Sequence, residues 1–204
     1  METDRDRLGA LLPVERLQLG PAVERRQREF ATGRACARAA LAKLGIAACP
    51  IPIGELGAPV WPTGTVGSIT HCSGYCAAAV GFRDSFRSIG IDAEPNAPLP
   101  AGVIDVVAAP KERDWLSSLA LEEPRICWDR LLFSLKESLY KACSALTARS
   151  MGFRDAVIAI DGQGLVDSIE IDFSDVGLTS ASELRGRWTC NGVILASSVV
   201  LARS

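Results

Sequence analysis

Residues 88–102 read SIGIDAEPNAPLPAG, and this stretch indicates how the chain is organised. It opens with a short apolar run, Ser88 to Asp92, which is typical of a β-strand. Prolines follow at positions 95, 98 and 100, with a glycine at 102, and such a segment continues neither a strand nor a helix. We therefore predict a boundary here, between an N-terminal half of residues 1–98 and a C-terminal half of residues 99–204.

The N-terminal half is predicted to contain one long helix followed by three strands. Pro21 suits the first turn of a helix, and Gly45 suits its exit. Apolar residues recur on one face of this helix: Val23, Phe30, Ala37, Leu41 and Leu44. The apolar segments 68–71, 76–82 and 88–92 are bounded by turn residues and predict the strands of a small sheet.

The C-terminal half repeats this order loosely. We predict a short helix over 112–121 and a long one over 126–146, whose apolar stripe is Trp128, Leu132, Leu135, Leu139 and Leu146. Strands are expected at 156–160, 169–173, 186–190 and 193–201. The chain is thus predicted to be α+β, a pseudo-two-fold pair of similar subdomains, each with a long helix on a small, mostly antiparallel sheet.

The composition is that of a globular protein with a core. The 204 residues are 48% hydrophobic and 23% charged, with a net charge of −2. This charge gives no general attraction to nucleic acid or an anionic membrane, and we expect neither as a partner. No secretory signal or apolar run of membrane-spanning length is visible. We expect a cytoplasmic monomer with reduced cysteines, and the single histidine and absence of a CxxC pair argue against a zinc site.

Two acidic positions are candidates for metal binding. Asp92 and Glu94 lie two residues apart in an extended segment, so their side chains point to the same face. Two like charges so close are costly unless a cation neutralises them, and Mg²⁺ prefers carboxylate oxygens. The alternative is a solvated strand end. On the long helix, Glu137 and Lys141 are one turn apart, which alone is equally typical of a surface ion pair.

Basic residues on the first helix suggest an anion site. Arg26, Arg34 and Arg38 are spaced by eight and four residues, so they fall within a sector of roughly 120°. Guanidinium groups on one side of a helix suit phosphate oxygens, although a solvated helix face has the same pattern. His71 ends a predicted strand, and a structural role is the alternative to a functional one.

Taken in order, these segments resemble the 4′-phosphopantetheinyl transferases, in particular the bacterial group that serves carrier proteins of fatty-acid, polyketide, nonribosomal-peptide and siderophore synthesis. The resemblance runs from about residue 21 to the C-terminus. The residues that carry it are Arg26, Glu29-Phe30, Gly33-Arg34, Cys36-Ala37-Arg38, Ala40-Leu41, Trp61-Pro62, Gly67-Ser68-Ile69-Thr70-His71-Cys72, Gly90-Ile91-Asp92-Ala93-Glu94-Pro95, Trp128-Asp129-Arg130, Phe133-Ser134-Leu135-Lys136-Glu137-Ser138 and Tyr140-Lys141.

The resemblance implies a site in the cleft between the two halves, with coenzyme A as co-substrate. The implied metal ligands, for Mg²⁺ or Mn²⁺, are Asp92, Glu94 and Glu137. The implied contacts to the coenzyme are Arg26, Arg34, His71, Lys136 and Lys141. One departure is that residues 50–60 contain no basic side chain, and Ile53 and Leu56 stand where a lysine or arginine is expected.

The implied reaction transfers the phosphopantetheinyl group to a serine of an acyl or peptidyl carrier protein and releases adenosine 3′,5′-bisphosphate. Asp92, Lys136 and Glu137 are the expected catalytic residues. Glu137 is the candidate base, acting directly or through water, and a metal-bound hydroxide is the alternative. Two other functions compete. One is a non-catalytic module that binds an anion through its arginines, and the other is a nucleotide hydrolase, although no GxxxxGK[ST] loop is present.

Overall fold

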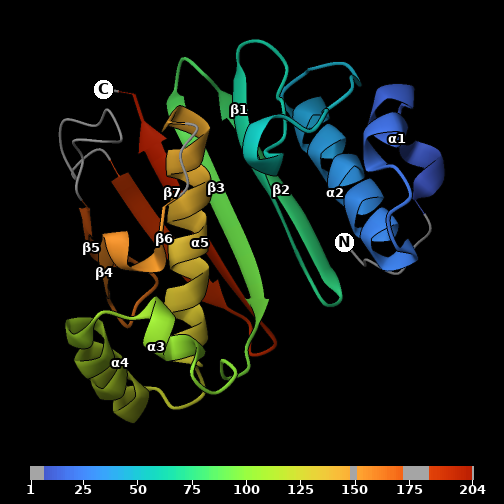
Figure 1. Cartoon of the computed structure of the whole chain (residues 1–204). Helices are drawn as coiled ribbons and strands as arrows, with labels where there is room; N and C mark the ends of the chain where they lie inside the picture. Colours follow the sequence, from blue (N-terminus) through green and yellow to red (C-terminus); the bar gives the residue numbers. More distant parts are fainter. Residues whose placement is uncertain (1–6, 148–150, 172–183, 204) are drawn as a thin grey trace.

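The fold combines helices with antiparallel sheets, and the predicted α+β class is confirmed (Figure 1). The computed structural model describes residues 7–147, 151–171 and 184–203. Its helices are α1 (Pro13–Leu19), α2 (Glu24–Lys43), α3 (Val103–Val107), α4 (Pro110–Glu122) and α5 (Trp128–Thr147), with short 3₁₀ turns at Leu8–Ala10, Glu55–Gly57 and Phe153–Asp155. The strands are β1 (Thr65–Cys72), β2 (Tyr75–Phe82), β3 (Phe86–Pro95), β4 (Ala156–Ile160), β5 (Val166–Ile171), β6 (Leu184–Cys190) and β7 (Ile194–Ala202).

Each long helix lies against antiparallel strands. Helix α2 packs on the β1–β2 hairpin, whereas α5 packs on the sheet β3-β7-β6 (Figure 1). Strands β4 and β5 form a further hairpin. Among the helices of the described ranges, none is both long and apolar enough to cross a membrane.

Strand β3 connects the two helix-on-sheet units. It pairs with β7 in register from Ser88 opposite Leu201 to Pro95 opposite Ile194, so it belongs to the sheet under α5. On its other side lies β1, and here two side-chain hydroxyls replace backbone acceptors. The Ile91 N–H donates to Ser68 Oγ (3.1 Å), and the Ala93 N–H donates to Thr70 Oγ1 (3.0 Å). The division at residue 98 itself stays a prediction.

The main core surrounds α5. Its buried apolar face packs against side chains of β7 and β6. Trp128 meets Trp188 edge to face, with ring centroids 5.3 Å apart. Gly90 on β3 allows the helix to approach closely, because a Cβ at this position would lie 1.9 Å from the Ser138 carbonyl oxygen. The helix is therefore held tightly over the strand that carries Asp92.

The predicted elements agree with the structure apart from their ends. Helix α2 begins at Glu24, so Val23 lies just before it and is exposed, which makes its assignment to the apolar stripe wrong. Helices α1 and α3 were not predicted, because seven and five residues are too short for a clear periodicity. Strand β5 begins three residues before the predicted start, and positions 172–173 of the predicted strand lie outside the described residues.

Candidate active site

Asp92 lies at the junction of three elements. It sits on β3 and is buried, and its Oδ1 accepts hydrogen bonds from Lys141 Nζ on α5 (2.7 Å) and from Thr70 Oγ1 on β1 (3.2 Å). Its Oδ2 is also buried but has no hydrogen-bond partner among the described residues. A buried carboxylate oxygen without a partner is costly, so this atom marks a place for a ligand.

Glu94 follows on the same strand and is held by an arginine. Arg130 Nη1 on α5 donates to Glu94 Oε2 (3.0 Å), and the same guanidinium donates to the carbonyls of Ala97 (3.0 Å) and Pro98 (2.9 Å). Burial raises the pKa of Glu94 and the neighbouring Asp92 raises it further, whereas Arg130 opposes the rise. Arg130 thus fixes both the second carboxylate and the proline-rich segment.

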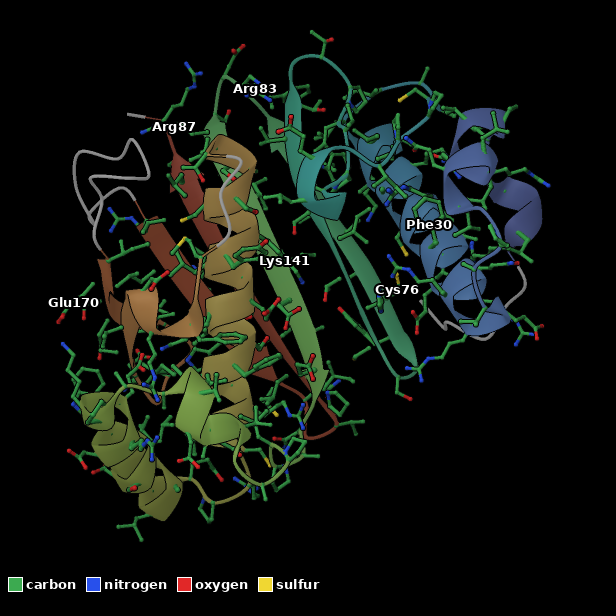
Figure 2. All side chains as sticks on the ribbon, viewed as in Figure 1. Phe30, Cys76, Arg83, Arg87, Lys141 and Glu170 are labelled. Atoms are coloured by element: carbon green, nitrogen blue, oxygen red, sulfur yellow. The ribbon has the colours of Figure 1, made fainter. Side chains whose placement is uncertain are left out.

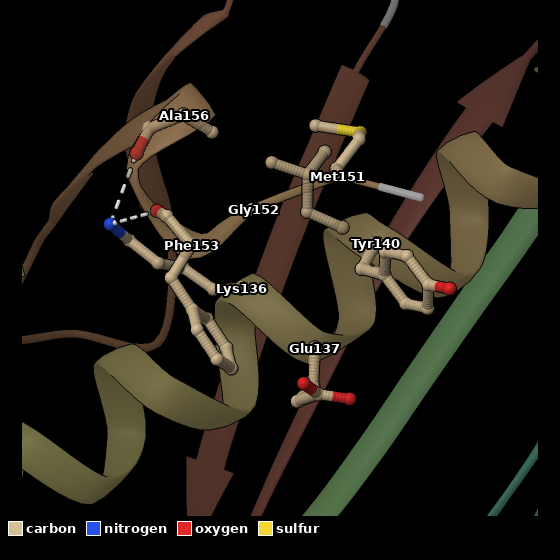
Figure 3. A pocket seen from close by; sticks show the side chains of 8 residues that line it. Lys136, Glu137, Tyr140, Met151, Gly152, Phe153 and Ala156 are labelled. Atoms are coloured by element: carbon tan, nitrogen blue, oxygen red, sulfur yellow. Dashed lines mark hydrogen bonds between the residues drawn. The ribbon is translucent and has the colours of Figure 1, made fainter. Parts of the chain in front are cut away.

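Glu137 supplies the third carboxylate, from α5. Burial raises its pKa, Lys141 opposes the rise, and Asp92 adds to it. Its side chain borders a small cavity of about 160 Å³, together with Tyr140, Met151 and Phe153 (Figure 3). The charge of Asp92 therefore acts on both Glu94 and Glu137.

The three acids supply oxygen donors that suit a divalent cation, but the structure does not draw them together as a ligand set. No group of three or more His, Cys, Asp or Glu side chains in the described ranges is positioned to hold a metal ion. The fit rests instead on the unpartnered Oδ2 of Asp92 and on the two neighbouring carboxylates whose pKa values it raises. Oxygen donors of this kind are those that Mg²⁺ and Mn²⁺ take.

Lys136 is not brought to this site. Its ammonium is buried in the C-terminal half, where it donates to Glu112 Oε2 (2.7 Å) and to the carbonyls of Val107 (2.8 Å), Phe153 (2.8 Å) and Ala156 (3.0 Å). Figure 3 shows it pointing away from the Glu137 carboxylate. Because consecutive helical residues lie about 100° apart, Lys136 and Glu137 face different neighbours. The expected phosphate contact of Lys136 would require this network to break.

A cavity of about 500 Å³ brings His71 and Arg26 together with Glu94 and Arg130. His71 Nδ1 lies 4.0 Å from Glu29 Oε2 on α2. Burial lowers the pKa of His71; Glu29 opposes this effect, and Arg26 adds to it. The imidazole is thus kept neutral near pH 7 and can donate one hydrogen bond.

Arg34 and Arg38, the other two arginines predicted to bind an anion, are held differently. The Arg34 guanidinium is mostly buried and stacks 4.2 Å above the Phe30 ring, and its Nε has no hydrogen-bond partner in the described part of the chain. Burial lowers its pKa to about 10, and the Glu15 charge opposes the change. Arg38 instead pairs with the buried Glu15 (2.7 Å) and caps the Ala10 carbonyl (2.6 Å). Arg38 therefore secures α1, which leaves Arg26 and Arg34 as the anion-binding candidates on α2.

Lys141 also borders a larger cavity, of about 580 Å³, on the other side of the Asp92 junction. This cavity is lined by residues 54–61 and 66–69, by Arg83, Arg87 and Ser88, and by residues 140, 141 and 144–146 of α5. Figure 2 shows Arg83 and Arg87 at the β2–β3 turn, near the end of α5. Sequence reasoning missed both, because their separation from residues 54–61 in the chain gives no signal of proximity. Arg83 and Arg87 therefore place positive charge beside residues 54–60, which belong to the segment 50–60 that has no basic side chain.

The Asp92 carboxylate has one open oxygen, and arginine and lysine side chains border the neighbouring cavities. Such side chains are suited to bind phosphate groups. Comparisons with known proteins define the family. Residues 15–81 match the model of the 4′-phosphopantetheinyl transferase N-terminal domain, and residues 88–189 match that of the 4′-phosphopantetheinyl transferase superfamily. The chain belongs to this superfamily, and it is an enzyme of the 4′-phosphopantetheinyl transferase class.

Two relatives are similar over nearly the full chain, and a third over about two thirds of it. The 4′-phosphopantetheinyl transferase Svp of Streptomyces mobaraensis is 42% identical over 97% of this chain and 81% of its own length. PptT of Mycobacterium tuberculosis is 44% identical over 93% of this chain and 86% of its own. Enterobactin synthase component D of Escherichia coli K12 is 37% identical over 68% of this chain and 64% of its own.

Proposed function

We propose that the protein transfers the 4′-phosphopantetheinyl group of coenzyme A to a serine of an apo-acyl or apo-peptidyl carrier protein, with Mg²⁺ or Mn²⁺, and releases adenosine 3′,5′-bisphosphate. The family supports the general transfer reaction. The name of the enterobactin synthase relatives favours a carrier of a siderophore or related assembly line.

The observation that carries the proposal is the open Oδ2 of Asp92, a carboxylate whose charge acts on both Glu94 and Glu137. In the proposed site, Asp92, Glu94 and Glu137 hold the cation. When bound, a divalent cation neutralises charge on the pyrophosphate and on the leaving nucleotide. Without it, three acids in a poorly solvated place would repel an anionic substrate.

The basic side chains orient the substrate. Arg26, Arg34 and neutral His71 are the proposed partners of phosphate oxygens on the α2 side, and Lys141 is the partner on the α5 side. We propose that Arg83 and Arg87 replace the basic residue missing from 50–60, because they border the same cavity as that loop. Charge-assisted hydrogen bonds from several directions fix the phosphorus for in-line attack.

Glu137 is the proposed general base. It lies on the long helix α5, which holds its carboxylate beside the proposed cation site, and an ionised carboxylate can accept a proton. It accepts the proton of the carrier serine, directly or through one water, as the serine oxygen attacks the β-phosphorus. The bond from that phosphorus to the bridging oxygen breaks, and the nucleotide leaves with its electron pair.

Analysis of the nucleotide product tests the proposal. Protein, coenzyme A and Mg²⁺ are incubated with or without an apo-carrier, and the nucleotides are separated by chromatography. We expect adenosine 3′,5′-bisphosphate only when the carrier and the metal are both present. Release without a carrier would identify a hydrolase instead, and no release under any condition would favour a binding module.

A further inference from the structure

We propose that Thr70 is a positioning residue, which turns the Asp92 carboxylate so that Oδ2 points to the divalent cation. The inference rests on the proposed function, since it assigns the cation to Asp92. Thr70 lies on β1, and its uncharged hydroxyl would act through the Asp92 carboxylate.

Thr70 Oγ1 accepts one hydrogen bond and donates another. The Ala93 N–H donates to Thr70 Oγ1 at 3.0 Å, so this contact uses the oxygen as an acceptor. A hydroxyl carries one proton, and that proton remains available for Asp92 Oδ1 at 3.2 Å. The same backbone that carries Asp92 thus fixes the oxygen that donates to its side chain.

The two oxygens of the Asp92 carboxylate differ in their hydrogen-bond partners. Oδ1 accepts from both Thr70 and Lys141, whereas Oδ2 is buried without a partner among the described residues. A partial rotation about the Cβ–Cγ bond would turn the open oxygen away from its present direction and lengthen both hydrogen bonds to the other oxygen. Two donors, one from β1 and one from α5, oppose this rotation better than one flexible lysine.

Ser68 provides an internal comparison two residues earlier on β1. Its Oγ accepts from the Ile91 N–H at 3.1 Å, as Thr70 does from Ala93, and both hydroxyls are buried. Ser68 therefore helps to join β1 to β3, but its described contacts do not include a carboxylate. Removing either hydroxyl leaves one β3 amide without its acceptor, and only the loss at Thr70 also frees Asp92 Oδ1 from a donor.

The experiment compares Thr70→Ala, Ser68→Ala and Thr70→Ser in the full chain. Binding of Mn²⁺ is measured directly, from the electron paramagnetic resonance signal of the free ion, without substrate. Loss of a group that orients a metal ligand typically weakens metal binding by about 10-fold or more, which is the effect expected for Thr70→Ala. Ser68→Ala and Thr70→Ser are expected to bind Mn²⁺ as the parent protein does.

The outcomes separate the inference from the proposed function. Failure of the parent protein to bind Mn²⁺ would remove the cation site and the inference with it. Normal binding by the parent and by Thr70→Ala would overturn the role of Thr70 alone. An equal loss in Ser68→Ala would also overturn it, because loosening of the β1–β3 contact would then explain both. Thr70→Val, which retains the side-chain volume, gives the same comparison if Thr70→Ala does not fold.

Discussion

Asp92 combines contacts from three parts of the chain: its own strand, Thr70 of β1 and Lys141 of α5. A buried carboxylate oxygen normally has a hydrogen-bond partner, and within the described residues Asp92 Oδ2 has none. The open oxygen is therefore better explained by a ligand than by folding. Asp92 and Glu137 should matter for activity more than for stability.

We expect Asp92→Asn and Glu137→Gln to retain the fold and to lose transfer activity by at least about 10²-fold, as expected when a preorganised charge is removed. Asparagine and glutamine preserve the shape of the side chains but not the charge that holds a cation. Turnover is measured with a saturating apo-carrier, and folding is checked by circular dichroism. Glu170→Gln, at an exposed acid paired with Lys111, serves as the control and should retain full activity. Retained turnover in either site variant would contradict the metal assignment.

The acids also predict a pH-dependent effect of Mg²⁺ on stability. Burial raises the pKa of Glu94 and Glu137 in the metal-free protein. Their contribution to stability is therefore present below the usual glutamate pKa of about 4.3, and is lost as the pH rises through the raised values. A bound cation favours the ionised form and offsets this loss.

The increase in Tm on adding Mg²⁺ should accordingly grow as the pH rises above the usual glutamate pKa and through the raised values of these two acids. It is measured by differential scanning fluorimetry, with Ca²⁺-free buffers and matched ionic strength. In Glu137→Gln, the growth with pH should be smaller, because one titrating ligand has been removed. A Mg²⁺ effect that is independent of pH would show that these two acids do not face the cation.

For single residues, the sequence predicts which charged side chains belong to the site better than it predicts the residues that contact them. Asp92 and Glu94 could be predicted because strand alternation places them on one face. Thr70, Arg83 and Arg130 could not, because their roles depend on which strands and helices become neighbours. Lys136 was assigned to the site although its ammonium is buried elsewhere, since the pattern of one helix does not reveal what covers each side.

Among the helices and strands, α5 is joined to α4 by a buried ion pair between Lys136 and Glu112. Glu112 of α4 accepts from Lys136, and its carboxylate also accepts the backbone N–H groups of Ala109 and Ile158. This one carboxylate thus connects α4, α5 and β4. The arrangement supports the helix that presents Glu137 and Lys141 to the site.

We expect Lys136→Met to lower the free energy of unfolding by about 3–5 kcal/mol, because it leaves Glu112 charged, buried and without its counter-ion. Urea unfolding is the measurement. Lys111→Met is the matched control: it breaks the exposed Lys111–Glu170 pair and should cost at most about 1 kcal/mol. A similar small cost at both positions would contradict the structural role of Lys136.

The long elements could be predicted because their periodicities are strong, and β4 was predicted with its observed limits, Ala156–Ile160. The pairing of β3 with β7 could not, since the two strands are distant in the chain. Helix α1 is similar in this respect. It is held by the contacts of Glu15 with Arg38 and with the Ile51 N–H, and neither contact has a local signature.

At the scale of the whole molecule, two helix-on-sheet units meet along β1 and β3, with basic cavities on either side of Asp92. The net charge of −2 gives no general attraction for an anion, so the proposed binding of coenzyme A depends on these local groups. Arg26 borders one cavity, whereas Arg28, on the same helix, is paired with Glu24.

Arg26→Ala is therefore expected to weaken coenzyme A binding by roughly 1.5–3 kcal/mol, the value of a hydrogen bond to a charged group. Arg28→Ala should leave the affinity unchanged. Calorimetry with coenzyme A and with dephospho-coenzyme A shows whether the 3′-phosphate is the partner, in which case only the first ligand loses affinity. Equal affinities of Arg26→Ala and the parent protein for coenzyme A would show that Arg26 is part of an ordinary solvated helix face and does not bind the ligand.

Modification of a carrier protein at a serine can be detected from the intact mass of an apo-carrier after incubation with the protein, coenzyme A and Mg²⁺. We expect the carrier to gain the mass of one phosphopantetheinyl group. This gain should be absent with Asp92→Asn, with excess chelator, or with a carrier whose serine is replaced by alanine. A carrier that keeps its apo mass in the complete reaction, or that gains the same mass after its serine has been replaced, would show that this chain does not modify a carrier serine.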